Sequence, residues 1–259
     1  MMDALLTLLQ LYDSNFPSGA YAHSLGLETY IQDGRVRDAK TFREYLEAHL
    51  RGPLVYTDGF AFRIVHEAAQ EHDFDRIASV DERLYVNNVP QETRTAACRM
   101  GTRLVMMART LFPDDALLME YAQGVRKGHV HGHPAVVYGL AAYAAGVEMS
   151  LGLAGYLYSS LAVQVQNGVR AIPLGQTDGQ LLLLALRAQI PDSVSRVLQL
   201  QDCDFGAVSP GLEMAQLRHN QLHVRIFMSK SSGGMAGWTR CVLVLGGRLA
   251  PARPCWWIN

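Results

Sequence analysis

Apolar residues at helical spacing run through most of this chain, and that spacing constrains its fold more than any other feature. The clearest example places apolar side chains at every fourth position, on one face of a helix: Leu153, Leu157, Leu161 and Val165. Before residue 230, no run alternates between apolar and polar residues over a length that predicts a strand. The sequence therefore predicts an all-α protein, a single-domain helical bundle of roughly ten helices.

Capping residues, glycines and prolines set the expected helix boundaries. Thr41 and Glu44 have capping-box spacing at the start of one helix, and Gly34 is expected to end the helix before it. Ser209 and Pro210 form an N-cap and first-turn pair for the last helix. The expected helices cover residues 5–12, 21–32, 41–50, 57–71, 74–85, 92–111, 114–128, 135–165 as two helices, 181–189, 193–200 and 210–226.

A polar stretch, residues 164–180, lies between two apolar segments and is expected to join two helices. Asn167-Gly168 predicts the end of the first helix, because both residues adopt the left-handed conformation that ends helices. Thr177 and Gln180 have capping-box spacing at the start of the second helix. The stretch is therefore interpreted as a helix joint.

The turn inside this joint presents two polar side chains, Arg170 and Gln176. Pro173 fixes its own φ and Gly175 permits a tight turn, so the two side chains would flank a rigid loop suited to a partner protein. Arg170 has two interpretations: it caps carbonyls at the end of the preceding helix, or it stabilises phosphate charge on a partner nucleotide as an arginine finger. The residues alone leave both open.

Three motifs follow one another over residues 5 to 229. They are Leu8-Leu9-Gln10-Leu11 followed by Phe16-Pro17-Ser18-Gly19-Ala20-Tyr21-Ala22-His23-Ser24-Leu25-Gly26-Leu27-Glu28; Arg170-x-x-Pro173-Leu174-Gly175-Gln176-x-x-Gly179-Gln180; and Ser209-Pro210-Gly211-Leu212-Glu213 followed by His219 and Arg225-Ile226-Phe227. In this order the motifs resemble the signature of UreF, the family of urease accessory proteins.

The resemblance implies a non-catalytic, dimeric scaffold for urease maturation. Its implied partners are a UreD/UreH-type accessory protein, the GTPase UreG and apo-urease, and these partners, not this chain, would handle nickel and GTP. The complex would deliver nickel into apo-urease and couple that delivery to GTP hydrolysis. The implied partner-binding residues are Arg170, Pro173, Leu174, Gly175, Gln176, Gln180, Glu213, His219, Arg225, Tyr21, His23 and Glu28.

Three histidines, His129, His131 and His133, lie within five residues, and imidazoles bind nickel and zinc. A metal site needs further ligands that this stretch does not supply, and a histidine before a proline at a helix start is ordinary. No metal site is therefore predicted. The alternative function is a nickel-binding metallochaperone that uses this cluster, and a third is an unrecognised helical enzyme.

Net charge and cysteine spacing argue against a nucleic-acid-binding protein and against a zinc-knuckle or redox protein. Net charge is −1 and the chain has no basic run that would neutralise phosphates, so nucleic acid is not expected as a partner. The four cysteines, Cys98, Cys203, Cys241 and Cys255, lie far apart without a C-x-x-C pair. This usage predicts neither a zinc knuckle nor a redox pair and suits a reducing cytoplasm.

The sequence favours a cytoplasmic protein without catalytic motifs. An acid, Asp3, stands where a signal peptide is positively charged. Glu148 divides residues 135–165 into two apolar pieces of about 13 residues, shorter than the ~20 of a membrane-spanning helix, so two buried core helices and no membrane partner are expected. Phosphate-loop, zinc-protease and serine-hydrolase motifs are absent, which favours a non-enzyme.

The last 30 residues differ in character from the rest. Residues 230–237 resemble a linker, and the part that follows holds all three tryptophans of the chain. The family motifs end near Phe227, so residues 1–229 are predicted to form the helical domain. Residues 230–259 are interpreted as an atypical tail, more readily non-native or disordered than functional.

Overall fold

The computed structural model describes residues 2–13, 15–17, 24–206 and 209–222, all within one compact unit, Met1–Ser229. Three predicted site residues, Tyr21, His23 and Arg225, and the tail of residues 230–259 lie outside the described residues. The interpretation of the tail stays a prediction.

The all-α prediction is confirmed, because the described residues contain helices and no strand. The elements are α1 (Met2–Leu11), α2 (Leu27–Gln32), α3 (Ala39–His49), the π-helical η2 (Leu50–Gly59), α4 (Phe60–Gln70), α5 (Phe74–Asn87), α6 (Gln91–Leu111), α7 (Ala116–Lys127), α8 (Pro134–Ala144), α9 (Met149–Ala171), α10 (Gln176–Arg187), α11 (Ile190–Gln199), the 3₁₀ turn η3 (Asp202–Asp204), α12 (Pro210–Arg218) and the 3₁₀ turn η4 (His219–Gln221).

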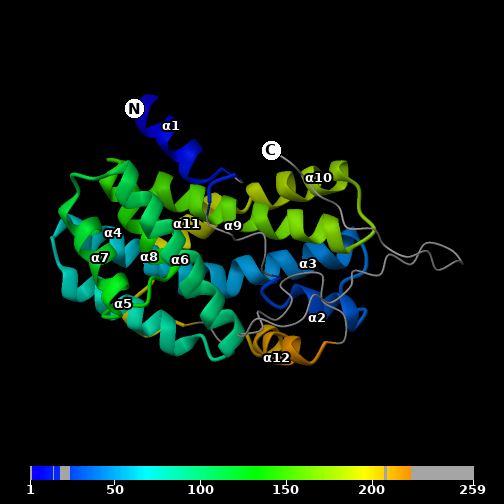
Figure 1. Ribbon diagram of the computed structural model, residues 1–259. Helices are drawn as coiled ribbons and strands as arrows, with labels where there is room; N and C mark the ends of the chain where they lie inside the picture. Colours follow the sequence, from blue (N-terminus) through cyan, green and yellow to red (C-terminus); the bar gives the residue numbers. More distant parts are fainter. Residues whose placement is uncertain (1, 14, 18–23, 207–208, 223–259) are drawn as a thin grey trace, which may run out of the picture. The chain divides into compact units, whose positions relative to one another are not determined.

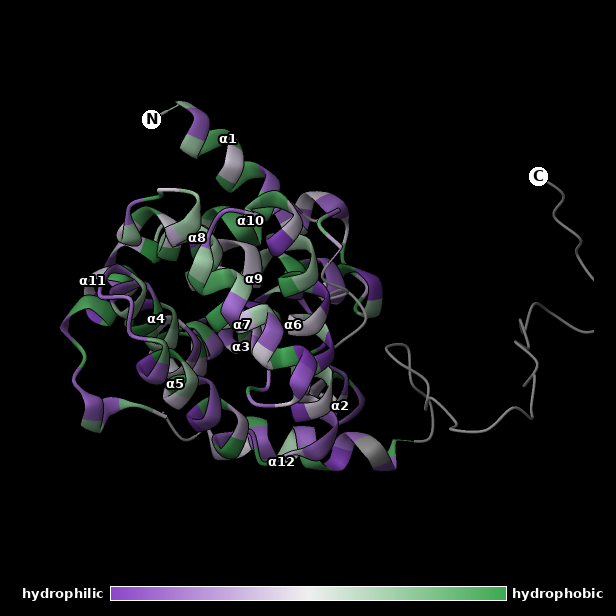
Figure 2. Ribbon diagram, turned by 60° about the vertical axis from the view of Figure 1, so that its left-hand side comes forward, coloured by the Kyte–Doolittle hydropathy of each residue, from purple (hydrophilic) through white to green (hydrophobic). Residues whose placement is uncertain are grey.

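The long helix α9 runs across the molecule, and α8, α10, α11 and α3 pack against it (Figure 1). Its predicted apolar face, Leu153, Leu157, Leu161 and Val165, is fully buried. The ribbon of α8 is mostly in hydrophobic colours, and α8 also packs closely on α4 (Figure 2). Helices α8 and α9 are therefore both part of the buried core, as the sequence predicted for residues 135–165. No helix in the described part of the chain has the length and hydropathy needed to cross a membrane.

The joint between α9 and α10 differs from its prediction at both helix ends. Helix α9 continues through Asn167 and Gly168 to Ala171. Gly168 lies against Phe42, and a Cβ on Gly168 would overlap that aromatic ring, so this glycine permits close packing and does not end the helix. Helix α10 begins at Gln176, and Asp178 accepts a hydrogen bond from the Gly175 N–H at 2.9 Å. The expected Thr177 and Gln180 capping box is therefore wrong.

Three further boundaries are corrected. Helix α2 begins at Leu27 and not near residue 21, because Leu25 and Gly26 have φ of 50° and 95°. The N-cap of α3 is Asp38, which accepts a hydrogen bond from the Thr41 N–H at 2.8 Å. The last α-helix stops at Arg218, short of the expected residue 226.

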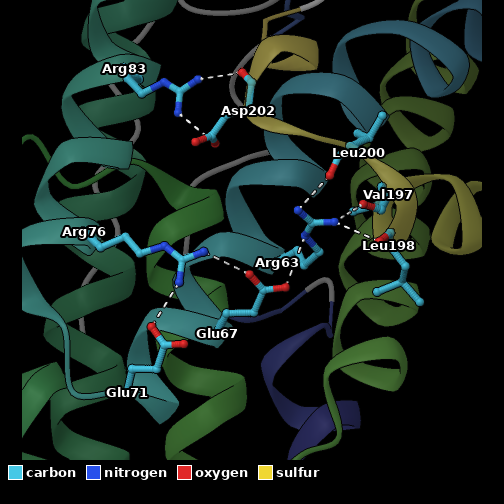
Figure 3. A network of polar contacts seen from close by, with 9 residues as sticks. All are labelled: Arg63, Glu67, Glu71, Arg76, Arg83, Val197, Leu198, Leu200 and Asp202. Carbon is cyan, nitrogen blue, oxygen red and sulfur yellow. Dashed lines mark hydrogen bonds and ion pairs between the residues drawn. The ribbon is translucent and has the colours of Figure 1, made fainter.

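An arginine network holds the segment that leads into α12 (Figure 3). Arg63 on α4 pairs with Glu67 at 3.4 Å and donates hydrogen bonds of 2.9, 2.9 and 3.0 Å to carbonyls at the end of α11, those of Val197, Leu198 and Leu200. Arg83 on α5 pairs with Asp202 at 3.6 Å. Carbonyls at a helix C-terminus lack partners within the helix, so Arg63 fixes the end of α11 on α4, and Arg83 fixes η3 on α5.

Candidate functional site

The turn between α9 and α10 is short and anchored at both ends. Ile172 is 5% exposed, and Leu174 is half-buried and packs against the core. The Leu174 N–H donates to the Ile172 carbonyl at 2.7 Å. A Cβ on Gly179 would lie 2.9 Å from a Val169 methyl group, so the start of α10 sits tightly on the end of α9. The turn is therefore held by two packed helices, which fix the course of its backbone.

Most of the predicted residues of this turn face solvent. The exposed ones are Arg170, Pro173, Gly175, Gln176 and Gln180. Arg170 lies in the last turn of α9, where a positive charge interacts favourably with the helix dipole. Both open interpretations of Arg170 fit this position, because an exposed guanidinium at a helix C-terminus reaches solvent as well as carbonyls.

Two predicted residues that are far apart in the chain, Glu28 and His219, lie together and are both buried. His219 is 8% exposed and lies between two carboxylates: its Nε2 is 3.0 Å from Glu28, and its Nδ1 is 3.0 Å from Glu92. Ser24 Oγ is 3.4 Å from the same Nε2. Glu28 itself is 1% exposed. Because each carboxylate meets a different edge of the ring, the three groups do not converge on one ion, and they join α2, α6 and η4.

Helix α12 is fastened to α2 by further hydrogen bonds. Thr29 Oγ1 donates to the Ala215 carbonyl at 2.8 Å, and Gln216 donates to the Leu25 carbonyl at 3.2 Å. Glu213, a predicted partner residue, accepts from the Ser209 N–H at 3.2 Å and so caps α12. Whether Glu213, Glu28 and His219 also contact a partner stays a prediction.

The three clustered histidines have separate environments. His129 is exposed; His131 lies 2.7 Å from Glu82 and stacks on Tyr85 with ring centroids 3.6 Å apart. His133 Nδ1 accepts from the Ala135 N–H at 3.3 Å, at the N-cap of α8. Among the residues that the structure describes, no group of three or more histidine, cysteine, aspartate or glutamate side chains is placed to hold a metal ion.

Asp81 is the central residue of this region, and none of the sequence motifs includes it. Its carboxylate is fully buried and accepts from Tyr121 at 2.8 Å and from the backbone N–H groups of His131, Gly132 and His133. One signal was present, because Asp81 falls on the apolar stripe of α5 with Ile77, Val80 and Leu84. An acid on a buried helix face indicates a paired carboxylate.

Comparisons with known proteins agree with the motifs. The UreF family model matches residues 36–187. A urease accessory protein UreF from Bacillus sp. (strain TB-90) is 40% identical over 228 residues, covering 88% of this chain and all of the relative. One from Lachnoclostridium phytofermentans is 41% identical over 229 residues, again 88% of this chain and all of the relative. The chain therefore belongs to the UreF family of urease accessory proteins.

Proposed function

We propose that this chain is a non-catalytic, cytoplasmic scaffold, active as a homodimer, that assembles with a UreD/UreH-type protein, the GTPase UreG and apo-urease. The partners bind nickel and GTP, and the scaffold couples GTP hydrolysis to nickel delivery. The observation that carries the proposal is the α9–α10 turn, where family-motif residues are exposed on a stiff support. A backbone that is already held in place loses little conformational entropy when a partner binds it.

Arg170 is the expected anchor of this surface. A guanidinium presents five donors in a planar fork that matches a carboxylate or a phosphate. Gln176 follows at the first position of α10, so both side chains project from the ends of helices that pack on one another. The exposed Pro173 and Gly175 between them leave room for a partner backbone to approach.

Arg170→Ala is expected to weaken binding of the GTPase without unfolding the chain. The change removes no buried apolar surface, so stability should fall by no more than ~1 kcal/mol. An arginine anchor at an interface contributes ~2 kcal/mol or more, which lowers affinity roughly thirtyfold. Binding is checked by the affinity for the purified GTPase with the UreD/UreH-type protein present, and folding is checked by a thermal melt. Gln176→Ala should show a smaller loss of affinity.

Arg126→Ala is the matched control, because Arg126 is also exposed in the last turn of a helix, α7. Its affinity for the GTPase should equal that of the wild type. Wild-type affinity in Arg170→Ala as well would remove the turn from the partner surface and leave it as a helix joint.

A further inference from the structure

A groove of about 1220 Å³ lies beside α1 and is lined by residues of η2, α5, α6, α9, α10 and α12 as well. Figures 1 and 2 both place α1 at the edge of the helical body. Its apolar lining includes exposed side chains, Leu5, Leu9, Leu151 and Tyr158, at 45%, 61%, 49% and 39%. The groove exceeds the ~300–1000 Å³ of small-molecule pockets, so its size suits a stretch of polypeptide.

Among the charged side chains that line this groove, the described ones are acidic. The described residues that line it include Asp13, Asp58 and Glu213 but no lysine or arginine, although the chain has 23 basic and 24 acidic residues. None of the three acids forms an ion pair with a described residue. Burial lowers the pKa of His49, which also lines the groove, to about 4, so this ring is neutral at pH 7. The groove therefore attracts cations.

Two acceptor groups on the groove wall, on Asp58 and Gln164, have one donor between them in the described part of the chain. Desolvation raises the pKa of the Asp58 carboxyl, and the nearby His133 and the Tyr156 hydroxyl, 3.4 Å away, oppose that shift. Gln164 is 3% exposed, and its Oε1 accepts no hydrogen bond from the described residues. The Asp58 side chain is half-buried and accepts one long hydrogen bond, from Tyr156, whereas a buried amide oxygen without any donor costs free energy. An ammonium or guanidinium entering the groove would add a donor for the Asp58 carboxylate.

We propose that this groove binds an amphipathic helical segment of a partner protein, one that buries an apolar face and carries lysine or arginine. Apolar grooves commonly take such a helix through side chains spaced three and four residues apart. Helix α1 of a second copy is a poorer match, because its ten residues include Asp3 and no basic residue. The proposal deepens the scaffold function and rests on it, since it specifies the chemistry of one partner segment.

The test uses a fluorescent peptide of about five helical turns, with leucine on one face and lysine on the other, and a counterpart with glutamate in place of lysine. Fluorescence anisotropy measures binding of each to the full chain. We expect the lysine peptide to bind and the glutamate peptide not to bind. The double variant Asp58→Asn with Glu213→Gln should bind the lysine peptide roughly tenfold more weakly, which corresponds to a loss of ~1.4 kcal/mol in binding free energy. Glu213→Gln keeps an acceptor for the Ser209 N–H.

The control is Asp114→Asn with Glu120→Gln, two exposed acids outside the groove that give the same change in net charge. Equal weakening by both double variants, or equal binding of both peptides, would overturn the proposal. Loss of self-association in Leu9→Glu, with peptide binding unchanged, would assign the groove to a second copy and also overturn it. If the chain binds no peptide but still activates urease in cells, this inference fails and the scaffold function stands. If the chain binds the peptide but cells without the chain still produce active urease, the scaffold function fails and the groove inference stands.

Discussion

Gly101→Ala is expected to destabilise the protein severely. Alanine within a helix is ordinarily more stable than glycine by about 0.5–1 kcal/mol. At position 101, in the interior of α6, a Cβ would overlap the carbonyl group of Gly132. That group belongs to the backbone, so relief requires moving the segment that Asp81 holds. The expected loss is ~3 kcal/mol or more, at or above the usual cost of overpacking.

Urea unfolding followed by circular dichroism measures this loss. Thr95→Ala is the control, because Thr95 is exposed on the same helix and alanine there adds no atom. The control should unfold at or slightly above the wild-type urea midpoint. A Gly101→Ala protein that unfolds at the same midpoint would show that α6 does not approach the backbone at Gly132 so closely.

Asp81→Asn is expected to have the next largest effect on stability. The carboxylate accepts hydrogen bonds from one hydroxyl and three backbone N–H groups. Asparagine keeps the volume but offers one oxygen, and its NH₂ group would face donors, so at least one buried donor loses its partner. Each unsatisfied buried group costs about 1–3 kcal/mol, and bonds to a charged acceptor are the stronger ones, so we expect a loss of about 3 kcal/mol.

The neighbouring Glu82→Gln provides the comparison. Glu82 pairs with His131, but its side chain is 61% exposed, and exposed ion pairs contribute little, about 0–1 kcal/mol. Urea midpoints of the two variants should therefore differ clearly. If both fell equally, the backbone contacts of Asp81 would not be what fixes residues 131–133.

Helical periodicity predicted the core, but it could not distinguish two uses of glycine. The buried stripe of α9 follows from spacing alone, because residues four apart lie on the same face of a helix. The sequence predicts a helix end at Gly168, yet this glycine lies within α9 against Phe42. A glycine that ends a helix and one that admits an aromatic ring look alike in sequence. The contact that separates them joins residues far apart in the chain.

The candidate site also has a part that the sequence predicts and a part that depends on tertiary contacts. Exposure of Arg170 and Gln176 could be predicted, since a polar stretch between apolar helices is placed at the surface by local chemistry. The pairing of His219 with Glu28 could not, because those residues are 191 positions apart and meet through the packing of α12 on α2. The separate environments of His129, His131 and His133 likewise depend on tertiary contacts.

The nickel content of urease purified from cells tests the central claim most directly, that this chain serves as a scaffold and not as a metal carrier. Two versions of the chain are compared in otherwise identical cells: Arg170→Ala, and the triple replacement of His129, His131 and His133 by asparagine, which retains an N-cap at position 133. The scaffold account predicts nickel-poor, inactive urease with Arg170→Ala and normally loaded urease with the triple variant. Nickel-poor urease with the triple variant, alongside normal loading with Arg170→Ala, would contradict it.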